Sequence, residues 1–216
     1  MTMEELEHSK EELKNKMING LLDYVRDGII PKKEANSFME CYNIFNKAAN
    51  DNNRCEELVK FHNEVMVQAT TECYEKIKNL YGIEFVDNFI LYTERLNLMI
   101  FNMDKIFAYL SSFYLNETEK YEEKTMSEFS MNIYKRYFFD KLQEKLFTTL
   151  KKIKKEESFY NLEHKIKTIE KIIGYLDLVK PKIAKSSATS MAWVETSTGQ
   201  NEKLNKYQNL YNNFKI

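Results

Sequence analysis

Hydrophobic residues recur at intervals of three and four along most of this chain. The longest unbroken series lies in residues 83–115 and consists of Phe85, Phe89, Tyr92, Leu96, Met99, Met103, Ile106, Leu110 and Phe113. This spacing is typical of one face of an α-helix and does not occur in strands. A second row on the same segment, made of Leu91, Leu98, Phe101, Phe107 and Tyr114, widens the apolar arc. We therefore predict one central helix about 50 Å long, covered by neighbours on most sides.

Polar turns and helix-breaking residues set the bounds of the other predicted helices. A first helix over about 3–27 stops near Gly28, and a second follows "PKKEA" and ends in the polar stretch 50–53. A third runs over about 56–81, with Gly82 in a C-cap position. The turn "LNETEK" follows the central helix and offers Asn116 or Thr118 as an N-cap.

Two more helices complete the predicted bundle. The fifth is marked by Met126, Phe129, Ile133, Tyr137, Leu142, Leu146, Leu150 and Ile153. A sixth covers about 159–180 and ends at Pro181. The predicted fold is all-α, an elongated bundle of five to six long antiparallel helices in residues 1–180. A flexible loop rich in Ser and Thr (181–200) and a short C-terminal helix (201–216) follow.

Composition narrows the function classes. The chain has 216 residues, 43% hydrophobic, with 5 Gly and 2 Pro, so turns are few and a sizeable core is possible. A net charge of -1 gives no overall field that favours nucleic acid or an anionic membrane, and we expect neither as a partner. No apolar run is long enough to cross a membrane. Three cysteines without close spacing fit a reducing compartment, so we expect a cytoplasmic or nuclear protein.

Catalytic and metal-binding patterns are not evident. Cys55 and His62 share a helical face, but Leu58 and Val59 between them are apolar and no third ligand completes a site. The simplest interpretation is a surface His62 and a buried Cys55. The sequence also lacks phosphate-binding and nucleotide-binding glycine motifs. We expect no enzyme activity, no metal and no cofactor.

The segment "NSFMECYNIFN" (36–46) has two apolar faces when drawn as a helix. One face carries Cys41, Ile44, Phe45 and Ala48, as a core-facing stripe should. The other carries Phe38, Met39 and Tyr42. This second face either is buried as well or contacts a partner. The central helix has a related feature, because Tyr109 stands within a polar stripe of Asn102, Lys105, Ser112 and Asn116. A Tyr inside a solvent-facing stripe is typical of a contact surface.

These two segments are where the chain resembles the cullin N-terminal domain. "SFMECYNIF" looks like the second helix of the first cullin repeat, and "MDKIFAYLSSFYL" is similar to the end of an apolar helix of that repeat. "YFFDKLQEKLFTTLKKIKKEE", "EHKIKTIEKIIGYLDL" and "KYQNLYNNF" resemble later segments in the same order. The chain departs from the family at Thr93, where a Trp is usual, and at Asn46, where an aromatic or apolar residue is common.

The resemblance implies a docking surface for a BTB/POZ-fold or Skp-type adaptor of ubiquitin ligase assemblies. Carried over residue by residue, the partner-binding residues would be Phe38, Met39, Tyr42, Asn46, Lys105, Tyr109 and Ser112. The family's RING-binding half has no counterpart in these residues, so the resemblance implies a non-catalytic scaffold or a competitor of complete ligases.

Two alternatives stay open. The first is a helical tethering or membrane-surface module, in which lysines of 151–155 would join Lys180, Lys182 and Lys185 in one basic patch. The second is a helical-bundle enzyme or metal carrier, for which the sequence supplies no ligand set.

Overall fold

Every element that the structure describes is a helix, which confirms the all-α class. The structure is a computed structural model and describes residues 2–29, 52–155, 164–169 and 171–172. All of these belong to one compact unit, Met1–Pro181. The predicted helix that contains 36–46, the predicted loop 181–200 and the predicted helix 201–216 lie outside the described residues.

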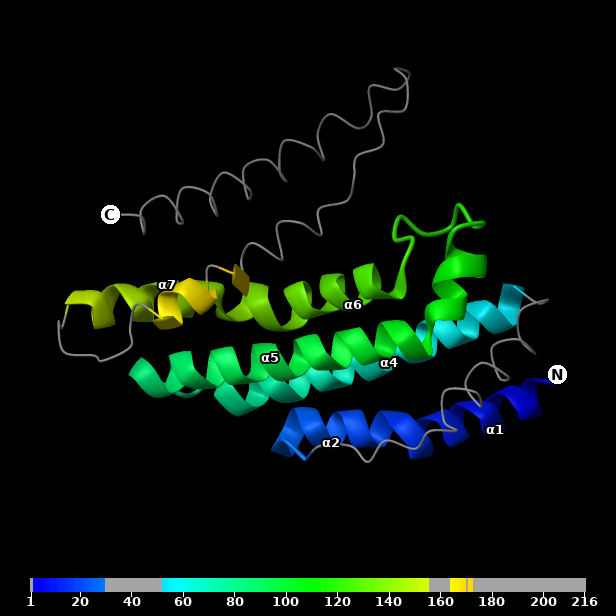
Figure 1. Cartoon of the computed structure of the whole chain (residues 1–216), viewed down its shortest axis with the longest axis horizontal. Helices are drawn as coiled ribbons and strands as arrows, with labels where there is room; N and C mark the ends of the chain where they lie inside the picture. The colour runs from blue at the N-terminus through cyan, green and yellow to red at the C-terminus, as the bar shows by residue number, and fades with distance from the viewer. Residues whose placement is uncertain (1, 30–51, 156–163, 170, 173–216) are drawn as a thin grey trace, which may run out of the picture. The chain divides into compact units, whose positions relative to one another are not determined.

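The described helices form three layers (Figure 1). The first layer is α1 (Met3–Leu13), a π-helical turn η1 (Lys14–Ile18) and α2 (Asn19–Asp27). The second is α4 (Asn52–Ile77) beside α5 (Gly82–Ile106). The third is α6 (Met126–Tyr134), the π-helical turn η3 (Lys135–Phe139) and α7 (Asp140–Lys155). A further π-helical turn, η2 (Leu110–Leu115), follows α5.

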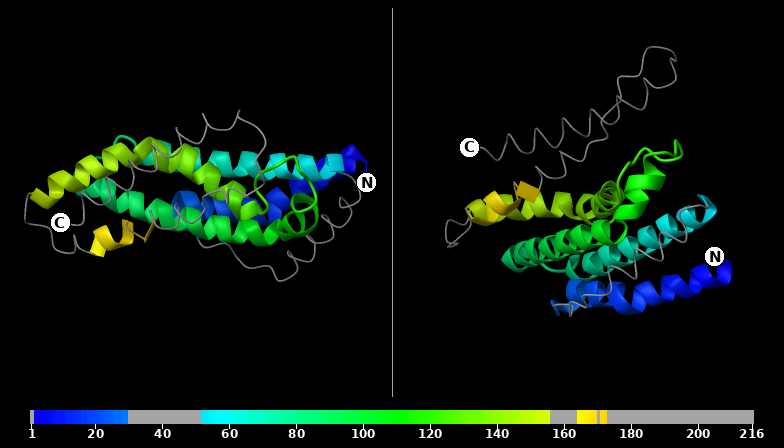
Figure 2. Two further views of the ribbon diagram at one scale, coloured as in Figure 1. Left: turned by 90° about the horizontal axis from the view of Figure 1, so that it is seen from above. Right: turned by 45° about the vertical axis from the view of Figure 1, so that its right-hand side comes forward.

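The middle layer packs against both outer layers. Contacts join α4 and α5 to α2 on one side and to α6 on the other, and Figure 2 shows the same order of layers from two further directions. α4 and α5 are antiparallel, as are α5 and α6–α7 (Figure 1). α1–α2 instead runs in the same direction as α4, because Lys10 pairs with Glu57 near the start of α4 and Arg26 with Glu72 near its end.

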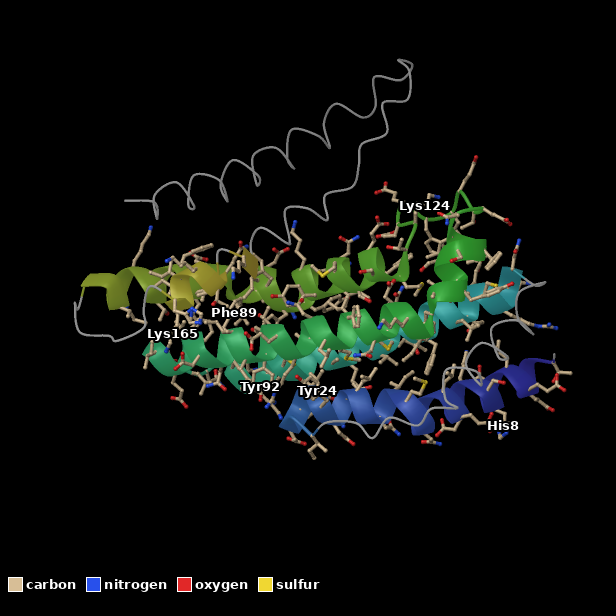
Figure 3. The ribbon with its side chains drawn as sticks, viewed as in Figure 1. His8, Tyr24, Phe89, Tyr92, Lys124 and Lys165 are labelled. Carbon is tan, nitrogen blue, oxygen red and sulfur yellow. The ribbon has the colours of Figure 1, made fainter. Side chains whose placement is uncertain are left out.

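Aromatic side chains fill the space between α5 and the third layer. Phe89 on α5 is fully buried and stacks on Phe138 of η3, with ring centroids 5.5 Å apart. Phe89 extends toward the third layer and Tyr92 toward α2 (Figure 3). Burying aromatic rings of this size supplies much of the hydrophobic stabilisation of a core.

Three cations hold the end of α2 against the middle layer. Arg26 binds Glu72 through two hydrogen bonds, at 2.5 and 2.9 Å. Arg95 on α5 donates to the carbonyl oxygens of Val25 and Arg26, both at 3.3 Å, and Lys76 also donates to Arg26. These carbonyls have no partner within the helix, so the side chains satisfy the C-terminal end of α2. Gly28, in the left-handed conformation at φ 77°, then turns the chain away.

The predicted central helix over 83–115 is interrupted, so the prediction of one continuous helix was wrong. α5 ends at Ile106, Phe107 leaves the helical conformation at φ -101° and ψ 15°, and η2 turns away from the axis of α5 (Figure 1). Phe107 is fully buried and packs edge-on against the His62 ring at 5.1 Å. The break carries Phe107 and Tyr114 into the core.

Some apolar side chains of this segment are buried and others are exposed. Helix α5 contacts α2, α4, α6 and α7, which confirms the prediction of neighbours on most sides. Its uncovered side carries Leu91, Leu98 and Phe101, which are 39, 42 and 55% exposed. Phe113, assigned to the core stripe, is 56% exposed. The π-helical turn explains this, because its wider turn rotates the residues that follow relative to an α-helical register.

Two predicted caps are wrong. α4 ends at Ile77, and Gly82 at φ 57° opens α5 instead of closing α4. The N-cap of α6 is Thr125 and not Asn116 or Thr118, since Thr125 and Glu128 form a reciprocal capping box. The first and fifth predicted helices match α1–α2 and α6–α7. Residues 164–169 and 171–172 are helical and fall within the predicted sixth helix.

Gly28→Ala should destabilise the fold. A Cβ there would lie 2.5 Å from Nη2 of Arg95, and φ 77° disfavours any side chain. We expect a loss of about 2 kcal/mol in the free energy of unfolding, measured by urea denaturation. Gly82→Ala is the matched control, because a Cβ at Gly82 meets no atom within 4 Å. Equal losses in the two variants would contradict the role given to Arg95.

Candidate protein-docking surface

The predicted docking residues fall into two groups. Phe38, Met39, Tyr42 and Asn46 lie outside the described residues. The other three predicted residues lie at the end of α5 and in the segment that follows it: Lys105 and Ser112 are exposed, and Tyr109 is half-buried.

Four residues at intervals of four form a series here, which we call the aromatic row: Phe101, Lys105, Tyr109 and Phe113. All are exposed except Tyr109, which is half-buried. The Lys105 ammonium lies 3.9 Å from the centroid of the Phe101 ring. Tyr109 and Phe113 stack with centroids 4.5 Å apart and an interplanar angle of 27°. Phe101 and Phe113 are 55 and 56% exposed, so the row presents two large apolar rings to solvent.

Sequence reasoning identified Lys105 and Tyr109 but placed Phe101 and Phe113 in the core. Phe101 lies four residues before Lys105 and Phe113 four residues after Tyr109, which is the spacing at which side chains on one helix meet. That spacing was the available signal. It was hidden because Phe113 also continues the apolar stripe of an uninterrupted helix.

Hydrogen bonds fix the backbone that carries the row. Ser111 accepts from the backbone N–H of Met126 at 2.9 Å, and Asp104 accepts from that of Ser127 at 3.1 Å. The first turn of α6 is thus satisfied by side chains from α5 and η2. Lys124, in the loop before α6 (Figure 3), donates to the carbonyl oxygens of Leu115 and Thr118 at the end of η2. The segment that carries Tyr109 and Phe113 is therefore fixed by hydrogen bonds to α6 and to the loop before α6.

Tyr114 and its neighbours tie the same loop to the start of α4. Lys120 pairs with Glu56 at 2.6 Å, and the Tyr114 hydroxyl donates to the same carboxylate at 3.3 Å. These contacts lower the pKa of Glu56, first through the Lys120 hydrogen bond. Burial and the Glu56 charge raise the pKa of Tyr114, so its hydroxyl stays a donor.

Cys55 and His62, which the sequence analysis considered as possible metal ligands, both lie in the core. His62 and Cys55 are 0 and 1% exposed, so the prediction of a surface His62 was wrong and that of a buried Cys55 is confirmed. The Nδ1 atom of His62 lies 3.0 Å from Oδ1 of Asn63, which can only accept. Nδ1 therefore carries the proton, and Nε2 accepts from Ser130 on α6 at 2.9 Å. Because His62 and Ser130 are both fully buried, no substrate reaches this pair.

Other candidate features give no reactive centre. Cys73 is buried, and burial raises the pKa of its thiol to about 12. The described residues contain no group of three potential metal ligands, and no described helix is long and apolar enough to cross a membrane. Of the lysines proposed for a basic patch, Lys151 and Lys152 are exposed, and the side chains of Lys154, Lys155, Lys180, Lys182 and Lys185 lie outside the described residues.

Comparison of the chain with family models, with curated proteins and with solved structures found no match.

Acid should destabilise the fold through His62. Burial lowers the pKa of His62 to about 4, against about 6.5 in an unfolded chain. Because the unfolded state binds the proton more tightly, stability is full above about pH 6.5 and falls as the pH decreases toward 4. The loss at pH 4 should be about 3 kcal/mol, measured by urea denaturation across this range.

His62→Gln is the control for this measurement, because glutamine does not titrate. Titration of carboxylates contributes to both proteins, so the difference between their pH profiles isolates His62. Parallel profiles would show that His62 is not the group responsible.

Proposed function

We propose that this chain is a non-catalytic helical docking module whose partner is a BTB/POZ-fold or Skp-type adaptor protein. The observation that carries the proposal is the aromatic row, a Lys105–Phe101 cation–π pair at the end of α5 and a stacked Tyr109–Phe113 pair in the segment that follows it. Exposed Tyr and Phe side chains on a rigid backbone are the residue types that dominate protein–protein binding energy. They also lose little conformational entropy on binding when they are already stacked.

The resemblance to the first cullin repeat supports the choice of partner. The row contains Lys105 and Tyr109, two positions that the resemblance assigns to adaptor contact, and Ser112 lies beside Phe113. A module of this kind acts as a scaffold for an assembly, or as a competitor that occupies the adaptor and keeps it from a complete ligase. Neither role needs a catalytic group in this chain.

Truncating the row should abolish adaptor binding. We expect Tyr109→Ala with Phe113→Ala to lose about 2 kcal/mol or more per ring, because hot-spot aromatics contribute on this scale. Titration calorimetry against a purified Skp-type adaptor and against one BTB domain measures this loss and identifies the adaptor class. Phe38→Ala with Met39→Ala tests the other predicted half of the surface in the same assay.

Leu91→Ala is the matched control, because Leu91 is 39% exposed on α5 but lies outside the row. It should leave the affinity unchanged. Circular dichroism and thermal melting check that each variant remains folded. Wild-type affinity in both double variants would refute the surface, and failure of the wild-type chain to bind either adaptor would refute the choice of partner.

A further inference from the structure

Cations and tyrosines gather where the end of α4 meets η3 and α7. We call this group the lysine–tyrosine patch: Tyr74, Lys78, Tyr81, Arg136, Tyr137, Lys141 and Lys145. The Lys141 ammonium lies 4.8 Å from the Tyr74 ring centroid and 5.5 Å from that of Tyr137. The Lys145 ammonium lies 4.6 Å from the Tyr81 centroid and 4.7 Å from that of Phe85.

Most cations of the patch lack a counter-charge. Lys78 pairs with Glu75. Arg136, Lys141 and Lys145 form no ion pair in the part of the chain that the structure describes, although Glu144 lies next to Lys145 in the sequence. Outside the patch the described cations include paired ones, such as Arg26 and Lys120, and unpaired ones, such as Lys105. The patch is distinguished by having three unpaired cations close together, although the net charge of the chain is -1.

The Lys145 ammonium is held by the two rings of Tyr81 and Phe85 and by a backbone carbonyl. It donates to the carbonyl oxygen of Lys78 at the end of α4. Partial burial lowers the pKa of Lys145, so its charged form is incompletely solvated. A cation in this state gains more from an incoming anion than a fully hydrated one, because part of its desolvation has already occurred.

The arrangement of the rings narrows the chemistry of the ligand. Single-stranded nucleic acid needs open aromatic faces on which bases stack, but Tyr74, Tyr81 and Tyr137 each have a cation at a ring face. A lipid surface needs several protruding apolar groups, whereas only Tyr81, 76% exposed, protrudes strongly here. Ammonium, guanidinium and phenol groups without an apolar pocket match carboxylates, which accept hydrogen bonds from all three.

We propose that the lysine–tyrosine patch binds an acidic peptide segment of a partner protein, with carboxylates on Lys141, Lys145 and Arg136. Lys141 and Lys145 are one helical turn apart, about 6 Å along α7. Glutamates four residues apart on a partner helix have the same separation, so such a helix can meet both lysines at once. This surface is distinct from the aromatic row, and the proposal does not depend on the adaptor.

Fluorescence anisotropy with a labelled helical peptide that carries Glu at every fourth position tests the proposal. The wild-type chain should bind this peptide but not its Gln analogue, and more weakly at about 150 mM than at about 50 mM salt. Lys141→Gln with Lys145→Gln should weaken binding about tenfold, because two charge-assisted contacts are lost. Lys141→Arg with Lys145→Arg should keep most of the affinity.

The matched control is Lys14→Gln with Lys105→Gln, which removes the same charge from lysines outside the patch. It should leave the peptide affinity unchanged, as should Tyr109→Ala with Phe113→Ala, which separates this test from the adaptor test. Thermal melting checks folding, and the Arg pair preserves the donor to Lys78 if the Gln pair is unstable. Equal losses in the two Gln pairs, absence of peptide binding, or preferential binding to oligothymidine or phosphatidylserine vesicles would overturn the proposal.

Discussion

Burial of Phe107 against His62 is the contact on which the arrangement around the aromatic row depends. Helix α5 stops at Ile106, and the fully buried Phe107 ring packs edge-on against His62 at 5.1 Å. His62 is itself oriented by Asn63 and Ser130, so helix α6 takes part in positioning the ring. The turn that follows places Ser111 and Asp104 on the start of α6 and leaves Tyr109 and Phe113 on the outside. A buried contact in the centre of the layers thus determines which side chains appear on the surface.

Buried polar pairs fix how the helices lie relative to one another. Hydrophobic contacts alone define this arrangement less closely. His62 and Ser130 join α4 to α6, and Thr93 and the Tyr134 hydroxyl, 3.1 Å apart, join α5 to α6. A shift of α6 by one residue would separate both pairs and leave buried polar groups without partners, which costs more than the bonds themselves contribute. Thr93 therefore has a structural role in this chain, because its hydroxyl pairs with that of Tyr134 in the core.

The sequence predicts the helices well where apolar spacing is regular, as in 3–27 and 126–155, although the N-cap of the second of these was misplaced. It does not predict the break after Ile106, because "KIFAYL" contains neither Gly nor Pro, and the residue that Phe107 packs against at the break, His62, is distant in the sequence. The π-helical turns η1, η2 and η3 have no comparable residue signature. The sequence likewise predicts only part of the aromatic row. Lys105 and Tyr109 stand out from a polar stripe, whereas Phe101 and Phe113 fit an apolar one, although both are exposed.

The two surfaces lie toward opposite ends of α5. Helix α5 has 25 residues, which corresponds to about 37 Å. The lysine–tyrosine patch includes Tyr81 just before its first turn, and the aromatic row begins with Phe101 in its last two turns. Phe85, Phe89, Leu96, Met99 and Met103 along the helix are fully buried, so the helix cannot bend without opening the core. A partner at each end would therefore be held at a fixed separation and could bind without excluding the other. A fixed separation between two partners is the property that the proposed scaffold role requires.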